Sequence, residues 1–320
     1  MTIQPLDFEQ PLIDLEKCLS ELTSNSPSDD KKTEDIRKQL ELMRTDLYKN
    51  LTAWQRIQIA RHPARPYALD YIEECFTDFI ELHGDRLFGD DQAMPAGLAK
   101  IGNHHCVVLM QQKGRSVKEN IKRTFGSPHP EGYRKALRLM RMAEKFSLPV
   151  IAFIDTPGAY PGIGAEERHI AEAIAVNLRE MMLLKTPILS IIIGEGGSGG
   201  ALGIGVADRV LMMENSYYSV ISPEGCAAIL WKHRNHRAEA ADALKLTAAD
   251  LSEFELIDSV IPEPMGGAHR DPKAVMATMS QTILSTLEEI TKIPMDKLLH
   301  QRYAKFRKMG VFSAYTTSNK

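Results

Sequence analysis

The sequence has 320 residues, enough to bury a sizeable core in one large domain or two small ones. Its composition, 43% hydrophobic and 25% charged, excludes wholesale disorder, and a net charge of -3 gives no general reason to expect nucleic acid as a partner. Four isolated cysteines predict neither a disulfide framework nor a zinc site. There is no signal-peptide core and no apolar run near the roughly 20 residues that span a bilayer, so we expect a cytoplasmic protein without a membrane segment.

Two amphipathic helices are predicted at the N-terminus. Apolar residues recur at three- and four-residue spacing over residues 8–23 and again over residues 36–51. Residues 24–32 between them are rich in Ser, Asp and Lys and contain a proline, which favours a loop. The resulting helical hairpin, residues 1–53, would be marginal alone, so we expect it to dock on the main body or on another subunit.

From about residue 67, short apolar runs alternate with helical stretches. This pattern predicts an α/β core over residues 54–272, with largely parallel strands joined by crossover helices. The expected strands are 106–110, 150–154, 188–193, 209–213, 218–222 and 256–261, and the clearest helices between them are 131–146 and 167–184. Residues 273–320 are expected to form a C-terminal helical region that ends in a loose tail at 316–320.

Glycine-rich loops follow two of the strongest predicted strands, at the carboxyl ends where open α/β sheets place ligands. The first loop is 155–168 (DTPGAYPGIGAEER) and the second is 194–205 (GEGGSGGALGIG). Successive backbone amides in such a turn point at one spot, where they attract an anion or a developing oxyanion. The alternative is a tight turn that only lets the next helix pack against its strand.

The second loop also matches other motifs. Residues 196–200 read G-x-S-x-G, the nucleophile elbow of hydrolases, with Ser198 as nucleophile and with Asp258 and His269 following in hydrolase order. However, no His-Gly-Gly oxyanion motif lies upstream, and the turn contains more glycine than an elbow requires. Hydrolysis is therefore the less favoured alternative, while a phosphate-binding loop lacks its lysine and a dinucleotide fingerprint matches poorly.

Basic residues gather in two places. Lys113 and Arg115 begin one cluster, and Arg134, Arg138, Arg141 and Lys145 share one face of the helix predicted at 131–146. Such a stripe is either a solvated face or an attraction for a polyanionic ligand or an acidic partner. The histidines have no metal-ligand spacing, and His169 fits packing better than base catalysis. The lack of an obvious acid, base or nucleophile indicates a reaction in which the protein supplies oxyanion stabilisation and positioning.

Several long stretches together resemble the alpha subunits of bacterial acetyl-CoA carboxylase carboxyltransferases. They appear in family order at 61–72, 113–146, 155–168, 194–210, 217–232 and 261–272. The resemblance implies a crotonase-like fold, a spiral of ββα units, with an N-terminal helical hairpin and C-terminal helices. It also implies transfer of a carboxyl group from carboxybiotin to acetyl-CoA, which forms malonyl-CoA in the committed step of fatty acid synthesis.

The same resemblance implies the partners. We expect a heterotetramer of two alpha and two beta subunits, with biotin on a separate carboxyl carrier protein and biotin carboxylase in the full complex. The beta subunit is expected to hold a zinc ribbon and most CoA contacts, with no metal in this chain. A non-catalytic scaffold subunit is a further alternative, alongside the hydrolase.

The resemblance assigns site residues one by one. The amides of Gly199 and Gly200 are expected to form an oxyanion hole for the ureido oxygen of biotin, while the beta subunit supplies the hole for the acetyl-CoA thioester. Lys113, Arg115, Arg134 and Arg138 are candidate contacts with an anion or a partner. The sequence departs from the family pattern at His169, where relatives usually have glycine. Substrate-binding residues are expected to be Gly158, Ala159, Tyr160, Pro161, Gly162, Gly196, Gly197 and Ser198.

Overall fold

The computed structural model describes residues 5–25 and 30–311, and its core is one eight-stranded sheet. The strands run in the order β1-β2-β3-β4-β5-β6-β8, and β7 pairs with the end of β5. The first three strands pair antiparallel, and β3 through β8 pair parallel. The strands are β1 Thr77–Glu81, β2 Ala96–Ile101, β3 His104–Met110, β4 Val150–Thr156, β5 Ile188–Gly197, β6 Arg209–Met213, β7 Tyr217–Ser219 and β8 Ser259–Ile261.

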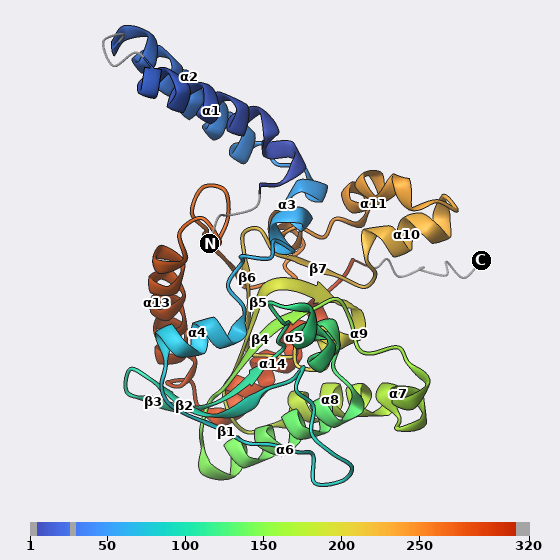
Figure 1. Cartoon of the computed structure of the whole chain (residues 1–320). Helices are drawn as coiled ribbons and strands as arrows, with labels where there is room; N and C mark the ends of the chain where they lie inside the picture. The colour runs from blue at the N-terminus through green and yellow to red at the C-terminus, as the bar shows by residue number, and fades with distance from the viewer. Residues whose placement is uncertain (1–4, 26–29, 312–320) are drawn as a thin grey trace, which may run out of the picture.

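The central strands are buried on both faces, which explains why their sequences read as unbroken apolar runs. Because side chains alternate along a strand, each run supplies two cores. On β4, Val150, Ala152 and Ile154 belong to the core beneath α6 and α8. Ile151 and Phe153 belong to the opposite core, beneath α4 and α13. Figure 1 shows these helices on the two sides of the sheet.

The helices are α1 Gln10–Asn25, α2 Asp30–Lys49, α3 Ala53–Ala60, α4 Ala68–Cys75, α5 Val117–Lys122, α6 Pro130–Phe146, α7 Ile163–Glu167, α8 Ile170–Leu183, α9 Ser198–Leu202, α10 Pro223–Leu230, α11 Arg237–Leu244, α12 Ala248–Glu253, α13 Pro272–Ile290 and α14 Met295–Lys308. Three short 3₁₀ helices cover Asp7–Glu9, Thr124–Gly126 and Arg234–His236. Helix α6 begins with Pro130 at its first position and ends at Ser147 in the left-handed conformation.

The N-terminal hairpin of α1 and α2 extends away from the body of the molecule (Figure 1). Leu12 and Leu40 are buried where its helices pack together. At its base, the buried carboxylate of Glu9 accepts hydrogen bonds from Tyr48 at 2.5 Å and from Arg270 at 2.7 Å. The contact with the body is therefore concentrated at the base, and the division at residue 53 stays a prediction.

The C-terminal helices are joined closely to the sheet. Val275, Met279 and Ile283 of α13 enter the same buried core as β3, β4 and β5. Helix α14 is held by Arg302, whose guanidinium makes two hydrogen bonds to Asp208 and three to backbone carbonyls. The expected tail at 316–320 lies outside the described residues. Among the residues that the structure does describe, no helix combines the length and apolar content that crossing a membrane requires.

Several predicted boundaries were wrong. The strand expected at 218–222 ends at Ser219, because Ser222 already caps α10 through a hydrogen bond from the amide of Gly225. The strand expected at 256–261 is reduced to β8, since residues 254–258 form the turns that leave α12. The helix expected at 167–184 begins only at Ile170 as α8, because α7 ends at Glu167 and His169 between them adopts a left-handed φ of 63°. Strands β1 and β2 were not predicted.

Candidate active site

The two glycine-rich loops lie side by side at one edge of the sheet. Strands β4 and β5 are parallel neighbours, and the register extends to Thr156 opposite Gly196. Both chains therefore leave the sheet at the same edge, as expected for a ligand site in an α/β sheet. The first four residues of the second loop, 194–197, continue β5 as strand, and the last three of them pair with β7.

The loops touch each other backbone to backbone, and glycine is what makes this contact possible. A Cβ on Gly197 would lie 2.2 Å from the carbonyl oxygen of Pro157. A Cβ on Gly200 would lie 2.4 Å from the amide nitrogen of Ala159 and 2.5 Å from the carbonyl carbon of Gly158. No real Cβ approaches backbone so closely, so Gly197 and Gly200 allow the two loops to form one unit.

The start of α9 presents free backbone amides. Ser198 opens the helix with a left-handed φ of 52°, followed by Gly199 and Gly200. The amides of Gly199 and Gly200 have no hydrogen-bond acceptor among the described residues. Two adjacent donors without intramolecular partners are what a bound anion or an oxyanion requires.

A pocket of about 340 Å³ opens beside Gly199, the first residue of this pair. Ser198 and Gly199 form its polar wall, and the rest is mainly apolar. A small apolar cavity with a few polar groups at one wall is the usual form of a ligand site. Its other lining residues are Leu202, Gly205, Val210, Tyr218, Ser219, Val220, Leu251, Leu256, Phe306 and Met309.

The predicted residues of the first loop lie around Thr156. Its hydroxyl donates to the carbonyl of Gly126 at 2.6 Å and accepts from the amide of Gly158 at 3.1 Å. Tyr160 stacks at a tilt on His129, with the ring centroids 4.3 Å apart, and its amide donates to the carbonyl of Pro128. The loop is thus held against the chain that precedes α6.

A buried network of charges lies beneath the second loop. The ammonium of Lys113 donates to Asp155 at 2.6 Å and to Glu195 at 2.7 Å. Glu195 also accepts from Arg61 at 2.7 Å and from the hydroxyl of Tyr217 at 2.6 Å. Burial alone would raise the pKa of Glu195, but Lys113 and Arg61 outweigh it and lower the pKa to about 2. Glu195 therefore stays ionised, and through Lys113 it links the carboxyl ends of β4 and β5.

The four basic residues predicted as anion or partner contacts are all engaged internally. Lys113 is neutralised by the two carboxylates just described. Arg115 pairs with Asp70 and donates to the carbonyl of Pro63 at 2.8 Å. Arg134 contacts Asp85 and Glu131, and Arg138 donates to the carbonyl of Gly84 at 3.0 Å. None of them lines the pocket beside Gly199, and contact with a partner stays a prediction for them.

Comparison with known proteins shows which family the chain is similar to. Residues 5–310 match the family described as acetyl co-enzyme A carboxylase carboxyltransferase-like. The acetyl-coenzyme A carboxylase carboxyl transferase subunit alpha of Geobacter metallireducens is 54% identical over 311 residues, covering 96% of this chain and 98% of the relative. The protein of the same name from Edwardsiella ictaluri is 52% identical over 317 residues, covering 97% and 99%. The chain belongs to this family.

Solved structures show the fold of this carboxyltransferase subunit. Transcarboxylase 12S superposes with a TM-score of 0.56 at 18% identity, covering 80% of this chain and 44% of that one. A Pseudomonas malonate decarboxylase hetero-tetramer in complex with coenzyme A gives 0.56 at 15% identity, covering 69% and 91%. The α/β, crotonase-like fold expected from the sequence is therefore confirmed.

The hydrolase alternative finds no support in the surroundings of Ser198. Ser198 is exposed, and the described residues around its pocket include no histidine. Asp258 accepts hydrogen bonds from the amide of Val210 and from Lys305. His269 is buried and stacks on His62, with the ring centroids 3.8 Å apart. The three residues of the suggested triad thus have separate surroundings.

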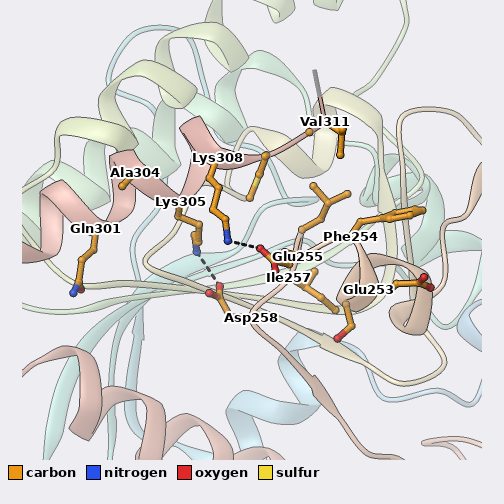
Figure 2. Close-up of a pocket in the computed structure, with 14 residues that line it drawn as sticks. Glu253, Phe254, Glu255, Ile257, Asp258, Gln301, Ala304, Lys305, Lys308 and Val311 are labelled. Atoms are coloured by element: carbon orange, nitrogen blue, oxygen red, sulfur yellow. Dashed lines mark hydrogen bonds and ion pairs between the residues drawn. The ribbon is translucent and has the colours of Figure 1, made fainter. Parts of the chain in front are cut away.

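A larger groove of about 1130 Å³ adjoins the apolar pocket, since Leu256 and Met309 line both. Figure 2 shows Lys305 and Lys308 of α14 pointing across it toward the segment that follows α12. Lys305 pairs with Asp258 at 2.8 Å and Lys308 pairs with Glu255 at 2.6 Å. Both lysines among the described lining residues of the groove are thus paired with carboxylates, and the glycine pocket is the better candidate.

Sequence reasoning missed the side chains that support the turn. Glu195 carried a signal, since an acidic residue within a glycine run at the end of a buried strand requires a partner. Arg61 and Tyr217 carried no such signal. They lie 134 and 22 residues from Glu195 in the sequence, and only folding brings them into contact with it. No group of three or more His, Cys, Asp or Glu side chains in the described part of the chain could hold a metal ion.

Proposed function

We propose that this chain supplies the biotin half of a carboxyltransferase site that forms malonyl-CoA from acetyl-CoA. Carboxybiotin, carried on a separate protein, supplies the carboxyl group, and its ureido oxygen gains negative charge when that group leaves. The amides of Gly199 and Gly200 hydrogen-bond this oxygen and stabilise the charge. The observation that carries the proposal is this pair of adjacent amides without acceptors among the described residues, the first of which lies at the wall of an apolar pocket.

The residues present fit a bicyclic, largely apolar group with one polar oxygen. The pocket supplies apolar walls from Leu202, Tyr218 and Leu256, and its polar side is the turn itself. The first loop supports the turn from behind, since Gly158 and Ala159 pack directly against Gly200. No side chain of the site is required as a base, because the ureido anion left when the carboxyl group departs would take the proton from the acetyl methyl. The buried Lys113, Asp155 and Glu195 are engaged with one another instead.

The acetyl-CoA half of the site comes from a beta subunit, in a heterotetramer of two alpha and two beta chains. Support for a multi-chain enzyme comes from the family and from fold neighbours such as the malonate decarboxylase hetero-tetramer. The biotin carboxyl carrier protein and biotin carboxylase complete the system. This assignment predicts no malonyl-CoA formation by the isolated chain and activity once the beta partner is added.

The decisive variant is Gly199→Pro, which removes one donor, with Gly199→Ala as its matched control. A Cβ at Gly199 meets nothing closer than Ile174 Cδ1 at 3.7 Å, so alanine fits and retains the amide. With the beta subunit present, we expect Gly199→Pro to lower kcat about 10²- to 10³-fold while KM for acetyl-CoA changes little. Gly199→Ala should stay within about threefold of wild type.

Complex formation and thermal stability are measured on the same samples, so that a folding defect is recognised. If Gly199→Pro assembles with the beta subunit and turns over at the wild-type rate, the chain is a scaffold and the proposed function is wrong. Ester hydrolysis by the chain alone that disappears in Ser198→Ala would instead support the hydrolase.

A further inference from the structure

Two buried side chains hold the carbonyl of Gly200 from beneath. The hydroxyl of Tyr133, on α6, donates to this oxygen at 2.9 Å. The side-chain amide of Gln111, just after β3, donates to the same oxygen at 2.7 Å. Both side chains are fully buried, and burial raises the pKa of the Tyr133 phenol well above its usual value, so it remains a donor. The Gly200 carbonyl of the proposed oxyanion turn thus accepts hydrogen bonds from two separate parts of the chain.

The neighbouring carbonyls of the turn are also fixed. Asn177 on α8 donates to the carbonyl of Gly203 at 2.9 Å and to that of Tyr133 at 3.0 Å. The amide of Gly203 in turn donates to the carbonyl of Gly199 at 3.0 Å. The Tyr133 ring also packs under α9, because a Cβ on Gly203 would lie 2.5 Å from its Cε1 atom. The carbonyls of Gly199, Gly200 and Gly203 therefore each have a fixed partner.

These buried polar side chains lower the stability of the folded chain, in a way that apolar side chains at the same positions would not. The second polar atoms, Gln111 Oε1 and Asn177 Oδ1, are buried without a hydrogen-bond partner in the described structure. A buried acceptor left unpaired is unfavourable by an amount comparable to a lost hydrogen bond. The presence of Gln111 and Asn177 in the core is therefore best explained by the backbone carbonyls that their side-chain amides hold in place.

Holding these carbonyls determines where the amides point. In a planar trans peptide the C=O and N–H groups point in opposite directions, so the Gly199 carbonyl, held by the Gly203 amide, sets the direction of the Gly200 amide. The Gly200 carbonyl, held by Tyr133 and Gln111, fixes the next peptide plane, so both planes that flank the Cα of Gly200 are fixed. Glycine itself leaves the backbone dihedrals free, and a turn with Gly199, Gly200 and Gly203 has little intrinsic rigidity. Preorganised donors stabilise a developing charge better than donors that must first reorient.

We propose that Tyr133 and Gln111 are positioning residues that preorganise the Gly200 amide of the oxyanion turn, because holding the Gly200 carbonyl fixes the peptide plane on the other side of the Gly200 Cα. The inference rests on the proposed function, because it assigns these amides to the reacting oxygen. Neither side chain touches the substrate, and both act through the backbone of α9.

The test compares two Tyr→Phe variants in the complex with the beta subunit. Tyr133→Phe removes the hydroxyl on Gly200, whereas Tyr71→Phe removes an equally buried hydroxyl that donates to Met213 Sδ. We expect Tyr133→Phe to lower kcat about tenfold with KM for acetyl-CoA within twofold, and Tyr71→Phe to keep the wild-type kcat. Combining Tyr133→Phe with Gln111→Leu should lower kcat further, toward the level of Gly199→Pro.

Amide hydrogen exchange over residues 194–205 gives a readout that does not depend on turnover. Exchange there should become faster in Tyr133→Phe than in Tyr71→Phe, while the two melting temperatures remain similar. A wild-type kcat in Tyr133→Phe together with an inactive Gly199→Pro overturns this inference alone. A wild-type kcat in both Tyr133→Phe and Gly199→Pro overturns the proposed function. Equal losses of kcat in the two Tyr→Phe variants also overturn the inference, because they indicate a general effect of a lost buried hydroxyl.

Discussion

Replacing Glu195 by glutamine tests the buried network beneath the glycine turn. The carboxylate accepts hydrogen bonds from Lys113, Arg61 and Tyr217, and its side chain is only 9% exposed. Its pKa is lowered from 4.5 to about 2, because Lys113 and Arg61 more than offset the effect of burial. Such a difference corresponds to about 3 kcal/mol of stability at neutral pH.

The sign of this contribution determines its pH dependence. A lowered pKa favours the folded state fully above pH 4.5, where the carboxylate is ionised in both the folded and unfolded chain. The contribution is lost as the pH falls from 4.5 toward 2 and the unfolded chain takes up the proton first. Glu195→Gln should therefore be less stable than wild type by up to about 3 kcal/mol at pH 7, and the difference should shrink as the pH falls.

The measurement is urea unfolding of the full chain by circular dichroism, at several pH values between 7 and 3. Glu73→Gln, on the exposed side of α4, is the control and should match wild type within about 0.5 kcal/mol throughout. A Glu195→Gln variant as stable as wild type at pH 7 would refute the reasoning. A stability difference independent of pH would refute it too, because the loss would then come from packing and not from charge.

Two further predictions concern stability. Arg302→Met should destabilise the chain by about 3–5 kcal/mol in urea unfolding, because it leaves Asp208 buried without its cation; a loss below about 1 kcal/mol would contradict this. Burial, and to a smaller extent His62, lower the pKa of His269 from 6.5 to about 3. The unfolded chain therefore takes up a proton first as the pH drops through this interval, and the free energy of unfolding should fall by at most about 1.4 kcal/mol per pH unit. His269→Phe should flatten this slope between pH 6.5 and 3, and an unchanged slope would assign it to other groups.

Periodicity in the sequence predicted the parallel part of the sheet well. Strands β3, β4 and β5 were expected close to where they lie, because a strand covered on both faces must be apolar at every position. Helices α6 and α13 were also predicted, since each has a single apolar face against the sheet. The antiparallel strands β1 and β2 were missed. The residues of β1 are mostly exposed at the edge of the sheet, so no apolar run marks them.

The glycine turn shows both what the sequence predicts and what only the folded structure reveals. The sequence alone located two glycine-rich loops, and the order of parallel strands was enough to expect them at one edge of the sheet. Only the tertiary structure decided that Gly197 and Gly200 meet the first loop at backbone distance, and that Tyr133 and Gln111 grip the Gly200 carbonyl. Those donors lie 67 and 89 residues from their acceptor.

The basic residues show the same limit. The spacing of Arg134 and Arg138 revealed a charged helix face but not what covers it, and folding brings Asp85 and the carbonyl of Gly84 to that face. Local periodicity is encoded within a few residues of each position, so the sequence determined the buried parallel strands, the long amphipathic helices, the glycine loops and the family. The partners of buried charges and backbone carbonyls lie on chain segments far apart in sequence. Only the tertiary structure therefore decided which residues support the turn.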